Sequence, residues 1–368
     1  MTIIVVSCNH FPDDERIYHR QIKTLLDFGA TINYFTRSSI KINLNEDRLR
    51  HFNFSNNLSV KKYITKVLKI LEKQKVSQFL HIHEPELLPL AKQIKHRLKI
   101  KVIYDVHEDL DAMYRTFSQR TKLVKEASIL IKHITERRHL SFVDNVILAN
   151  RPLRRTLYEH KGFRPVILEN FPQKKYVIKI PKNAKHNYSI IYHGHLGPER
   201  GIHDLVMAMP QVISKNPFSK LTLIGTFRTK EFEQKIRKLI SDYELKEKVR
   251  IKPQVPYVEI WDELYHSALG VIPFQNNIMS QNNTPTKLFE MMAAGCRIVT
   301  SDLPPIRNFL SNTVHWTIPN DISSLASGII DAQTSLKQTD WIDSNIELIN
   351  KKYNWELKSV DFLNVYNL

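Results

Sequence analysis

Residues 271–295 read VIPFQNNIMSQNNTPTKLFEMMAAG, and this stretch decides the fold prediction. The apolar run Val271–Phe274 predicts a buried strand, and a helix follows it after a polar loop. Thr284 suits the N-cap of that helix, and Pro285 suits its first position because proline lacks the N–H that would have no partner there. A strand that leads into a helix N-terminus is the unit of a parallel α/β sheet.

The start of this helix is also a candidate anion site. Its free amides favour negative charge, Lys287 adds a full positive charge one turn in, and Glu290 follows three residues later on nearly the same face. A diphosphate and a ribose diol would fit such an arrangement. The alternative is a capped helix on which Lys287 and Glu290 pair with each other.

Apolar runs bounded by polar turns recur along the whole chain. They are Ile3–Val6, Ile32–Phe35, Phe79–Ile82, Val102–Val106, Val146–Ala149, Ile190–Tyr192, Leu221–Ile224, Val271–Phe274 and Ile298–Val299. Helical patterns lie between most of them, and this alternation predicts parallel sheets covered on both faces, with ligands at the carboxyl ends of the strands. We therefore predict an α/β fold of two doubly wound, Rossmann-like domains that face a central cleft.

The length of 368 residues also favours two domains, since it is more than one hydrophobic core usually spans. Residues 165–185 contain three prolines and no helical period, so we expect the hinge there. The predicted domains are residues 1–170 and 171–352. Two cysteines, Cys8 and Cys296, are too few for a disulfide framework or a four-thiolate zinc site.

Glycine is concentrated in the second half. Six of the nine glycines lie between residues 194 and 295, whereas the loop Ser7–Asp14 after the first predicted strand has none. Glycine lets the backbone approach a ligand closely, so phosphate binding is expected in the second half. The first loop is not the G-x-G-x-x-G fingerprint of dinucleotide-binding proteins.

Positive charge is concentrated in the first half, where residues 1–170 carry 30 Lys and Arg against 18 Asp and Glu. Lysines and apolar residues alternate at helical spacing in residues 61–75, and basic residues recur in 95–101 and 115–138. These segments are either solvated faces of packed helices or a surface for an anionic membrane. No helix-turn-helix, zinc-finger, RNP or GXXG signature supports nucleic acid as the partner. Without a spanning segment or signal peptide, the chain is expected to be cytoplasmic.

Glu290 with Ala293-Ala294-Gly295 resembles the second half of the E-x7-E motif of retaining glycosyltransferases of family 4, which have the GT-B fold. Asn282 replaces the first glutamate, as in the N-x-x-P-x-K-x-x-E form of members that build bacterial surface polysaccharides. The resemblance implies that Glu290 binds the ribose hydroxyls and that Asn282 faces the donor sugar.

The resemblance extends to the first domain. Residues 10–17 (HFPDDERI) look like the H-P-x-D-x-R-I loop that faces the acceptor, and HEPE at 83–86 and YDVHE at 104–108 look like further motifs of that domain. The resemblance implies acceptor-side roles for five residues: His10, Asp14, Arg16, His83 and Glu86. His107 would lie near the transferred sugar. Residues 353–368 resemble the final helix that crosses back to the first domain.

YHGHLGPERG at 192–201 looks like the first strand and turn of the donor domain, with His195 in place of one of two usual cations. Arg200 and Lys287 would then balance the diphosphate. The donor-binding residues implied are Gly194, His195, Arg200, Asn283, Thr284, Thr286, Lys287 and Glu290. The catalytic residues implied are His107, Arg200, Lys287 and Asn282.

The family implies transfer without a protein nucleophile: the leaving diphosphate takes the acceptor proton while cations and helix amides stabilise its charge. No metal or other cofactor is expected, and Asp109-Leu110-Asp111 is interpreted as the acidic start of a helix rather than a metal-binding D-x-D. The expected partners are a UDP- or GDP-sugar, a lipid-linked or polysaccharide acceptor and the inner face of the plasma membrane. Two alternatives remain, namely a nucleotide-sugar epimerase of the same fold and a non-catalytic binding or scaffold subunit.

Overall fold

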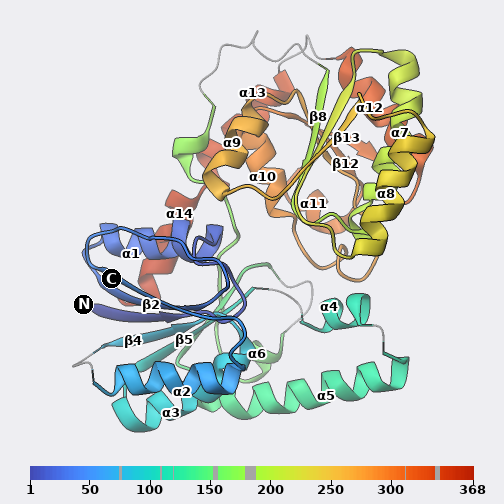
Figure 1. Cartoon of the computed structure of the whole chain (residues 1–368). Coiled ribbons are helices and arrows are strands. Elements are labelled where there is room, and N and C mark those ends of the chain that lie inside the picture. Colours follow the sequence, from blue (N-terminus) through green and yellow to red (C-terminus); the bar gives the residue numbers. More distant parts are fainter. Residues whose placement is uncertain are drawn as a thin grey trace. The chain divides into compact units, whose positions relative to one another are not determined.

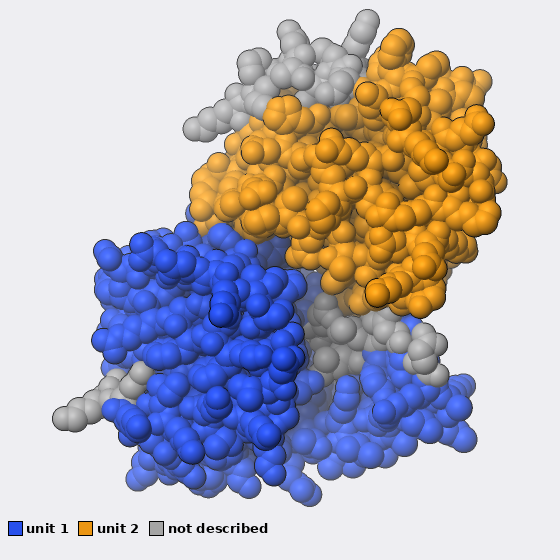
Figure 2. Space-filling model, viewed as in Figure 1, with its two compact units in different colours: residues 1–170, 356–368 blue, residues 171–355 orange. Residues whose placement is uncertain are grey.

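The computed structural model describes residues 1–73, 77–107, 110–118, 120–151, 156–178, 188–310, 312–335 and 340–368. The chain forms two compact units, which Figure 2 distinguishes by colour. Unit 1 consists of Met1–Asn170 together with Glu356–Leu368, and unit 2 consists of Phe171–Trp355. The sequence-based domains were 1–170 with 353–368, and 171–352.

Unit 1 is built on a seven-stranded sheet with the order β3-β2-β1-β4-β5-β6-β7, in which every strand pairing is parallel. Its strands are β1 Thr2–Val6, β2 Thr31–Arg37, β3 Leu49–Phe54, β4 Phe79–Ile82, β5 Lys101–Val106, β6 Asn145–Leu148 and β7 Val166–Ile167. The central strands β1, β4 and β5 are almost wholly apolar and buried, as expected of strands covered on both faces.

Helices cover both faces of this sheet, with α2, α3 and α5 on one side and α1 and α14 on the other (Figure 1). The helices are η1 Glu15–Ile22, α1 Lys23–Asp27, α2 Val60–Leu71, η2 Pro85–Leu87, α3 Leu88–Leu98, α4 Leu110–Phe117, α5 Lys122–His139, η3 Leu140–Phe142, α6 Leu157–His160 and α14 Trp355–Asn364. The core on the α2 side joins these helices to the inward residues of β1, β4, β5 and β6.

Unit 2 repeats the plan with a six-stranded sheet of order β10-β9-β8-β11-β12-β13, again wholly parallel. Its strands are β8 Ser189–His193, β9 Lys220–Ile224, β10 Val249–Lys252, β11 Leu269–Ile272, β12 Arg297–Ser301 and β13 His315–Thr317. Its helices are η4 Lys174–Tyr176, η5 Pro198–Arg200, α7 Ile202–Lys215, α8 Lys230–Asp242, α9 Tyr257–Tyr265, α10 Thr286–Ala293, α11 Pro304–Arg307, α12 Ile322–Thr334 and α13 Asp340–Lys351.

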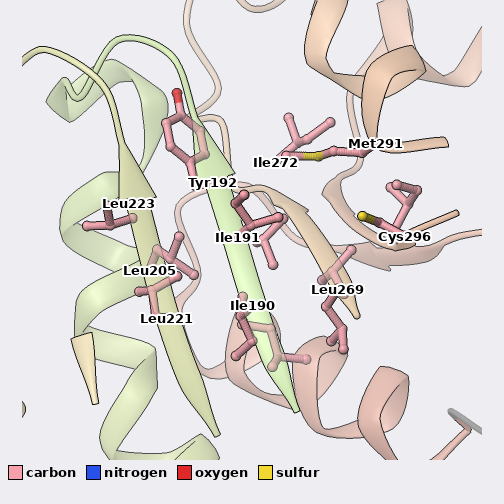
Figure 3. Close-up of a cluster of buried hydrophobic side chains, with 14 of the residues drawn as sticks. Ile190, Ile191, Tyr192, Leu205, Leu221, Leu223, Leu269, Ile272, Met291 and Cys296 are labelled. Carbon is pink, nitrogen blue, oxygen red and sulfur yellow. The ribbon is translucent and has the colours of Figure 1, made fainter. Parts of the chain in front are cut away.

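The core of unit 2 gathers around β8. Figure 3 shows Ile190 and Ile191 of that strand among side chains of the neighbouring strands and helices, including Leu205 and Met291. Tyr192, at the carboxyl end of β8, directs its hydroxyl group away from this cluster. The core therefore ends where the strand meets its loop, and polar chemistry begins at that edge.

The predicted fold class is confirmed: each of the two α/β units is built on a doubly wound parallel sheet. Each of the nine predicted strands is present within a few residues of its predicted bounds. Four further strands, β3, β7, β10 and β13, were not predicted. The hinge prediction was wrong for Val166–Ile167, which form β7, and residues 179–185 of the predicted hinge lie outside the described part of the chain.

The last helix belongs to unit 1, as the fold prediction has it. The Tyr366 hydroxyl forms a hydrogen bond of 2.6 Å with His81 Nδ1 on β4, and Lys358 pairs with Glu169 at 2.8 Å. The side-chain amide of Asn145 on β6 donates to the carbonyl of Val365 at 3.2 Å. The carboxyl-terminal segment is thus tied to several strands of the first unit.

Gly201 shows how tightly the first turn of unit 2 is packed. It has a φ of 68°, and a Cβ atom built there would lie 1.7 Å from the carbonyl oxygen of Pro273. Gly295 has a similar φ of 70°, but its nearest neighbour would be a methyl group of Ile178 at 3.1 Å. A side chain is therefore strained at both positions and sterically excluded by backbone only at Gly201.

We expect Gly201→Ala to lower the free energy of unfolding of unit 2 by about 3 kcal/mol or more, and Gly295→Ala by about 1 kcal/mol. The measurement is urea unfolding followed by tryptophan fluorescence, because all four tryptophans lie in unit 2. Equal losses for the two variants would show that the contact with Pro273 is not the constraint.

Candidate active site

The predicted acceptor-side residues lie at the carboxyl ends of three adjacent strands of unit 1. His10 and Asp14 follow β1, His83 follows β4 and His107 follows β5. His10 Nδ1 is 3.0 Å from Asp14 Oδ2, and His83 Nδ1 is 3.0 Å from His107 Nε2. The rings of His10 and His107 are 4.5 Å apart. The fold therefore brings these four residues into one cluster.

Asp14 orders the loop that carries His10. Its carboxylate caps η1 by accepting from the amides of Arg16 and Ile17, both at 2.9 Å. Burial opposes the charged form, but the nearby His10 and the amide donors hold the pKa of Asp14 below its ordinary value. An ionised Asp14 fixes both the helix start and one ring nitrogen of His10.

Arg16 lies below this cluster rather than in it. Its guanidinium binds Asp105 through two nitrogens, at 2.8 and 3.0 Å, and its third nitrogen donates to Leu168 O and Asn170 Oδ1. Arg16 and Asp105 are 2% and 0% exposed. Because all of its nitrogens serve protein groups, we assign Arg16 a structural role in place of the predicted acceptor contact.

Glu86, the other predicted acid, is exposed on η2, whereas Glu84 is buried. The Glu84 carboxylate accepts from Ser7 Oγ at 2.7 Å and from the amides of Cys8 and Asn9 at 3.1 and 3.0 Å. Glu84 therefore holds the loop after β1 in place. The sequence signal that we missed is its position, since Glu84 comes two residues after the last buried residue of β4.

His81, His83 and Asp105 offer ligand atoms within 4.8 Å of one another, the spacing of a possible metal site. Asp105 Oδ2, however, already accepts from Gln21 at 2.6 Å and from Arg16 Nε at 3.0 Å. A cation would have to sit beside the Arg16 guanidinium. The chemistry of this donor set fits a hydrogen-bonded network better than a metal site.

The charge state of this network follows from its burial. Burial and the nearby His10 lower the pKa of His107 well below its ordinary value, and burial and His83 do the same for His81. Burial would raise the pKa of Asp105, but Arg16 and His107 hold it well below its ordinary range. At neutral pH, His81 and His107 are therefore neutral imidazoles beside the internal Arg16–Asp105 ion pair.

In unit 2, the predicted donor-site residues gather where β8 and β11 end and α10 begins. Lys287 Nζ lies 3.2 Å from the Tyr192 hydroxyl, 4.7 Å from the centre of the Tyr192 ring and 5.0 Å from that of Phe274. The Arg200 guanidinium carbon lies 4.6 Å from the same Phe274 centre. The two predicted phosphate cations therefore contact one aromatic ring.

Glycine provides the space for this arrangement. A Cβ atom on Gly194 would lie 3.0 Å from Lys287 Nζ, and one on Gly225 would lie 1.9 Å from the Gly194 carbonyl oxygen. Gly194 has a φ of 107°, in the left-handed region that favours glycine. The loops after β8 and β9 can approach Lys287 this closely only without side chains at these positions.

Glu290 is 3% exposed, and its Oε2 atom lies 3.4 Å from His193 Nε2. Burial and the charge of Lys287 lower the pKa of His193 to about 3, so this imidazole is neutral at neutral pH. The contact is therefore not an ion pair.

One detail of the α10 prediction changes. Pro285, not Thr284, occupies the N-cap position, so the helix begins at Thr286. The cap prediction was wrong by one residue because the proline backbone is extended, with a ψ of 115°. The side-chain amide of Asn282 donates to Ile278 O at 2.8 Å, and the backbone amide of Asn283 donates to Met279 O at 3.0 Å. Both asparagines thus help to close the loop before α10.

Sequence reasoning missed Arg228, which follows the carboxyl end of β9. Its Nη2 atom donates to Glu199 Oε1 at 3.0 Å, and Arg200 Nε lies 3.7 Å from the same oxygen. Burial, Arg228 and Lys287 lower the pKa of His195 to about 4, so His195 adds no positive charge at neutral pH. Arg228 is the additional cation of this loop cluster.

Of the D-x-D motif, Asp109 lies outside the described residues and Asp111 is 2.8 Å from His133 Nε2 on α5. Asp111 therefore joins α4 to α5. This contact agrees with the interpretation of the motif as the start of a helix.

The two parallel-sheet units have the GT-B fold, which the solved structures described below share. Residues 173–346, just under half of the chain and wholly within unit 2, match the family described as "Glycosyl transferases group 1". This match supports a glycosyltransferase. No curated protein matches the chain.

Solved structures resemble the chain over its whole length. Anabaena Alr3699/HepE in complex with UDP has a TM-score of 0.75 at 16% identity, with 100% of both chains covered. Sucrose-phosphate synthase (tll1590) from Thermosynechococcus elongatus has a TM-score of 0.73 at 15% identity, with 100% of this chain and 98% of that chain covered. An E. coli structure titled trehalose-6-phosphate, bound with UDP-2-fluoro glucose, has a TM-score of 0.67 at 15% identity, with 99% of both chains covered. At these identities the likeness shows the fold.

We expect Asp105→Asn to lower the free energy of unfolding of unit 1 by about 3–5 kcal/mol at pH 7, because it leaves the Arg16 charge buried without a counter-charge. The folded-state pKa of Asp105 is lowered, so its contribution is complete above its unfolded pKa of about 4 and is lost as the pH falls toward the folded value. The variant should therefore lose less stability than the wild type between pH 5 and pH 3.

The measurement is urea unfolding followed by far-UV circular dichroism, with tryptophan fluorescence reporting unit 2 separately. Glu126→Gln is the matched control, because Glu126 pairs with Arg115 at the surface, where an ion pair contributes little to stability. A loss as small for Asp105→Asn as for this control would contradict the role of the buried pair.

Proposed function

We propose that the chain is a retaining, metal-independent glycosyltransferase that transfers a sugar from a nucleotide sugar to a lipid-linked or polysaccharide acceptor in cell-surface glycan synthesis. Unit 2 binds the nucleotide sugar and unit 1 binds the acceptor. The enzyme works at the inner face of the plasma membrane.

The observation that carries the proposal is the position of Lys287. It lies in the first turn of α10, where free amides already favour an anion, and Gly194 leaves room beside its ammonium group. Arg200 flanks the same Phe274 ring. The two cations and the helix amides stabilise a diphosphate leaving group as its charge develops.

Glu290 has the position expected of a ribose-binding acid. It is one turn beyond Lys287 on α10, and its charge is not neutralised by His193, whose pKa of about 3 keeps the imidazole uncharged. A buried carboxylate that accepts two hydroxyl hydrogen bonds from a diol gains back the solvation that burial removes.

The neutral His107 imidazole of unit 1 suits the acceptor. It can donate a hydrogen bond to a sugar hydroxyl or accept one without adding charge, because burial and the nearby His10 lower the pKa of His107 well below its ordinary value. The acceptor proton passes to the departing diphosphate as the new glycosidic bond forms and the sugar–phosphate bond breaks. The chain's own groups then only orient the two substrates.

The ligands bound in the similar structures favour UDP over GDP as the nucleotide. Anabaena Alr3699/HepE was solved with UDP-glucose as well as with UDP, and the E. coli structure holds UDP-2-fluoro glucose. The membrane part of the proposal rests on the basic surface of unit 1, where the lysines of α2 are exposed. Within the part of the chain that the structure describes, no helix has the length and apolarity to span a bilayer.

Calorimetric titration in EDTA should show saturable binding of UDP. Glu290→Ala should weaken binding of both uridine and UDP by about tenfold or more, because the ribose contacts are lost from both. Lys287→Ala should weaken the binding of UDP by a similar factor and leave the binding of uridine unchanged, since it removes only the phosphate contact. Lys246→Ala, an exposed lysine of the same unit, is the control.

Equal losses of uridine and UDP in Lys287→Ala would contradict its phosphate role. If the folded wild type binds neither UDP nor GDP, the scaffold alternative replaces the enzyme proposal. Release of an epimerised sugar without any acceptor would favour the epimerase.

Replacing EDTA by manganese should change the affinity for UDP by less than about twofold, because the fixed cations of unit 2 take the place of a metal bound to the diphosphate. The measurement is the same titration with and without manganese chloride. Affinity that appears only with manganese would refute metal-independent donor binding.

A further inference from the structure

The apolar face of α5 is exposed to solvent. Leu123, Leu130, Ile131 and Ile134 are 84%, 59%, 64% and 51% exposed, and Val124 is 45% exposed. With Ala127 they recur at the spacing of one helix face, and five of the eighteen exposed large hydrophobic side chains among the described residues lie on this one helix. We call these five the α5 stripe. An apolar patch of this kind marks a binding surface.

The opposite face of α5 is held by polar contacts. Glu136 is buried and accepts from the Tyr104 and Tyr158 hydroxyls at 3.1 and 2.7 Å, and His133 contacts Asp111 on α4. Glu126 also binds Arg115 of α4 through two hydrogen bonds of 2.8 and 2.9 Å. These contacts set the rotation of the helix, so the α5 stripe faces outward.

The positive charge of α5 indicates which kind of partner covers the α5 stripe. The helix carries exposed Lys122, Lys132, Arg137 and Arg138, whereas its two acids are satisfied within unit 1. A second copy would bring the same cations face to face, which disfavours self-association. An anionic bilayer accepts both features, since aliphatic side chains enter the headgroup boundary while Lys and Arg meet the lipid phosphates.

The neighbouring helices extend the basic surface. α2, α3 and α5 pack side by side on one side of the sheet (Figure 1). The apolar residues of α2, such as Val67 and Leu68, are buried, so α2 offers lysines but no insertion surface. Only α5 in this layer combines exposed cations with a run of exposed aliphatic side chains among the described residues.

We propose that α5 is the membrane-insertion element of this protein, which lays the α5 stripe into the headgroup region of an anionic lipid bilayer. The proposal deepens, and rests on, the membrane part of the proposed function, because it names the helix that touches lipid. It does not depend on which nucleotide unit 2 binds.

The test is flotation of the full chain with phosphatidylcholine vesicles, with and without about one-third phosphatidylglycerol. Substituting serine at Leu130, Ile131 and Ile134 together should lower partitioning onto the anionic vesicles by about tenfold or more. The matched control substitutes serine at Phe218, Val258 and Ile318, three exposed side chains of unit 2 that are 76%, 51% and 63% exposed. UDP titration of each variant shows that unit 2 is intact.

A probe on α5 tests insertion directly. Cys8 and Cys296 are both buried, so an environment-sensitive fluorophore can be attached selectively after Leu130→Cys. Its emission should shift to the blue only when anionic vesicles are added. Emission that is already blue-shifted without lipid, or a dimer in sedimentation that the serine variant converts to monomer, would show that protein covers the stripe and would overturn the proposal.

The outcomes separate the two claims. Wild-type protein that binds UDP but no vesicle overturns the membrane part of the proposed function together with this inference. If the α5 serine variant binds anionic vesicles as well as the wild type does, only the assignment to α5 is overturned. Equal losses in the α5 and unit 2 serine variants also overturn that assignment.

Discussion

Unit 1 depends on one buried ion pair, Arg16 with Asp105. Asp105 is the fifth residue of β5, and Arg16 lies in the first turn of η1 after the first loop, so the pair joins the first helix to a central strand. A charge in this environment is tolerated only because both groups are fully hydrogen-bonded. Arg16 also reaches Leu168 and Asn170, so the same guanidinium holds the end of the first stretch of unit 1.

The histidine cluster follows from this pair. His107 lies 3.7 Å from the Asp105 carboxylate, close enough for its charge to favour protonation. Burial and the neighbouring His10 and Arg16 oppose protonation of His107, and they prevail. An internal charge that is already balanced by Arg16 leaves the His107 imidazole free to act as a neutral hydrogen-bonding group at the loop edge.

Unit 2 differs from unit 1, because several of its positively charged side chains lie close together. Lys287 lies in α10, Arg200 in η5 and Arg228 after β9, and glycines at 194, 201 and 225 let these segments approach one another. Aromatic faces of Tyr192 and Phe274 and the carboxylate of Glu199 lower the repulsion among the cations.

Much of the fold could be predicted from the sequence, and the omissions share a cause. The predicted strands are central or next to central, where both faces are covered and the sequence is a continuous apolar run. The four missed strands β3, β7, β10 and β13 are the edges of the two sheets, with mixed sequences such as VRIK and HWT. Edge strands bury less surface, so they carry no such run.

The site was predictable where a motif fixes a backbone position and less so where side chains compete. Lys287 and Glu290 lie on the helix predicted after the strand near residue 271, and Gly194 follows β8, as the sequence pattern predicted. The role of Glu84 depends on contacts with the amides of Cys8 and Asn9 in the loop after β1, and its position two residues after β4 was the sequence signal for it. Arg228 is distant in sequence from the other residues of its cluster. Only the pairing of strands in the sheet brings it close to them.

Helix α5 shows the limit of periodicity most clearly. The spacing of its aliphatic residues correctly indicates that they share a face, and the same pattern in α2 faces the core. In α5 the buried Glu136 and the contacts to α4 turn that face outward instead. Hydrophobic burial would favour the opposite rotation, at roughly 25 cal/mol for each Å² covered. A fold that keeps aliphatic side chains exposed against this driving force has polar anchors strong enough to hold them there, and gains from the exposure only when a partner covers the face.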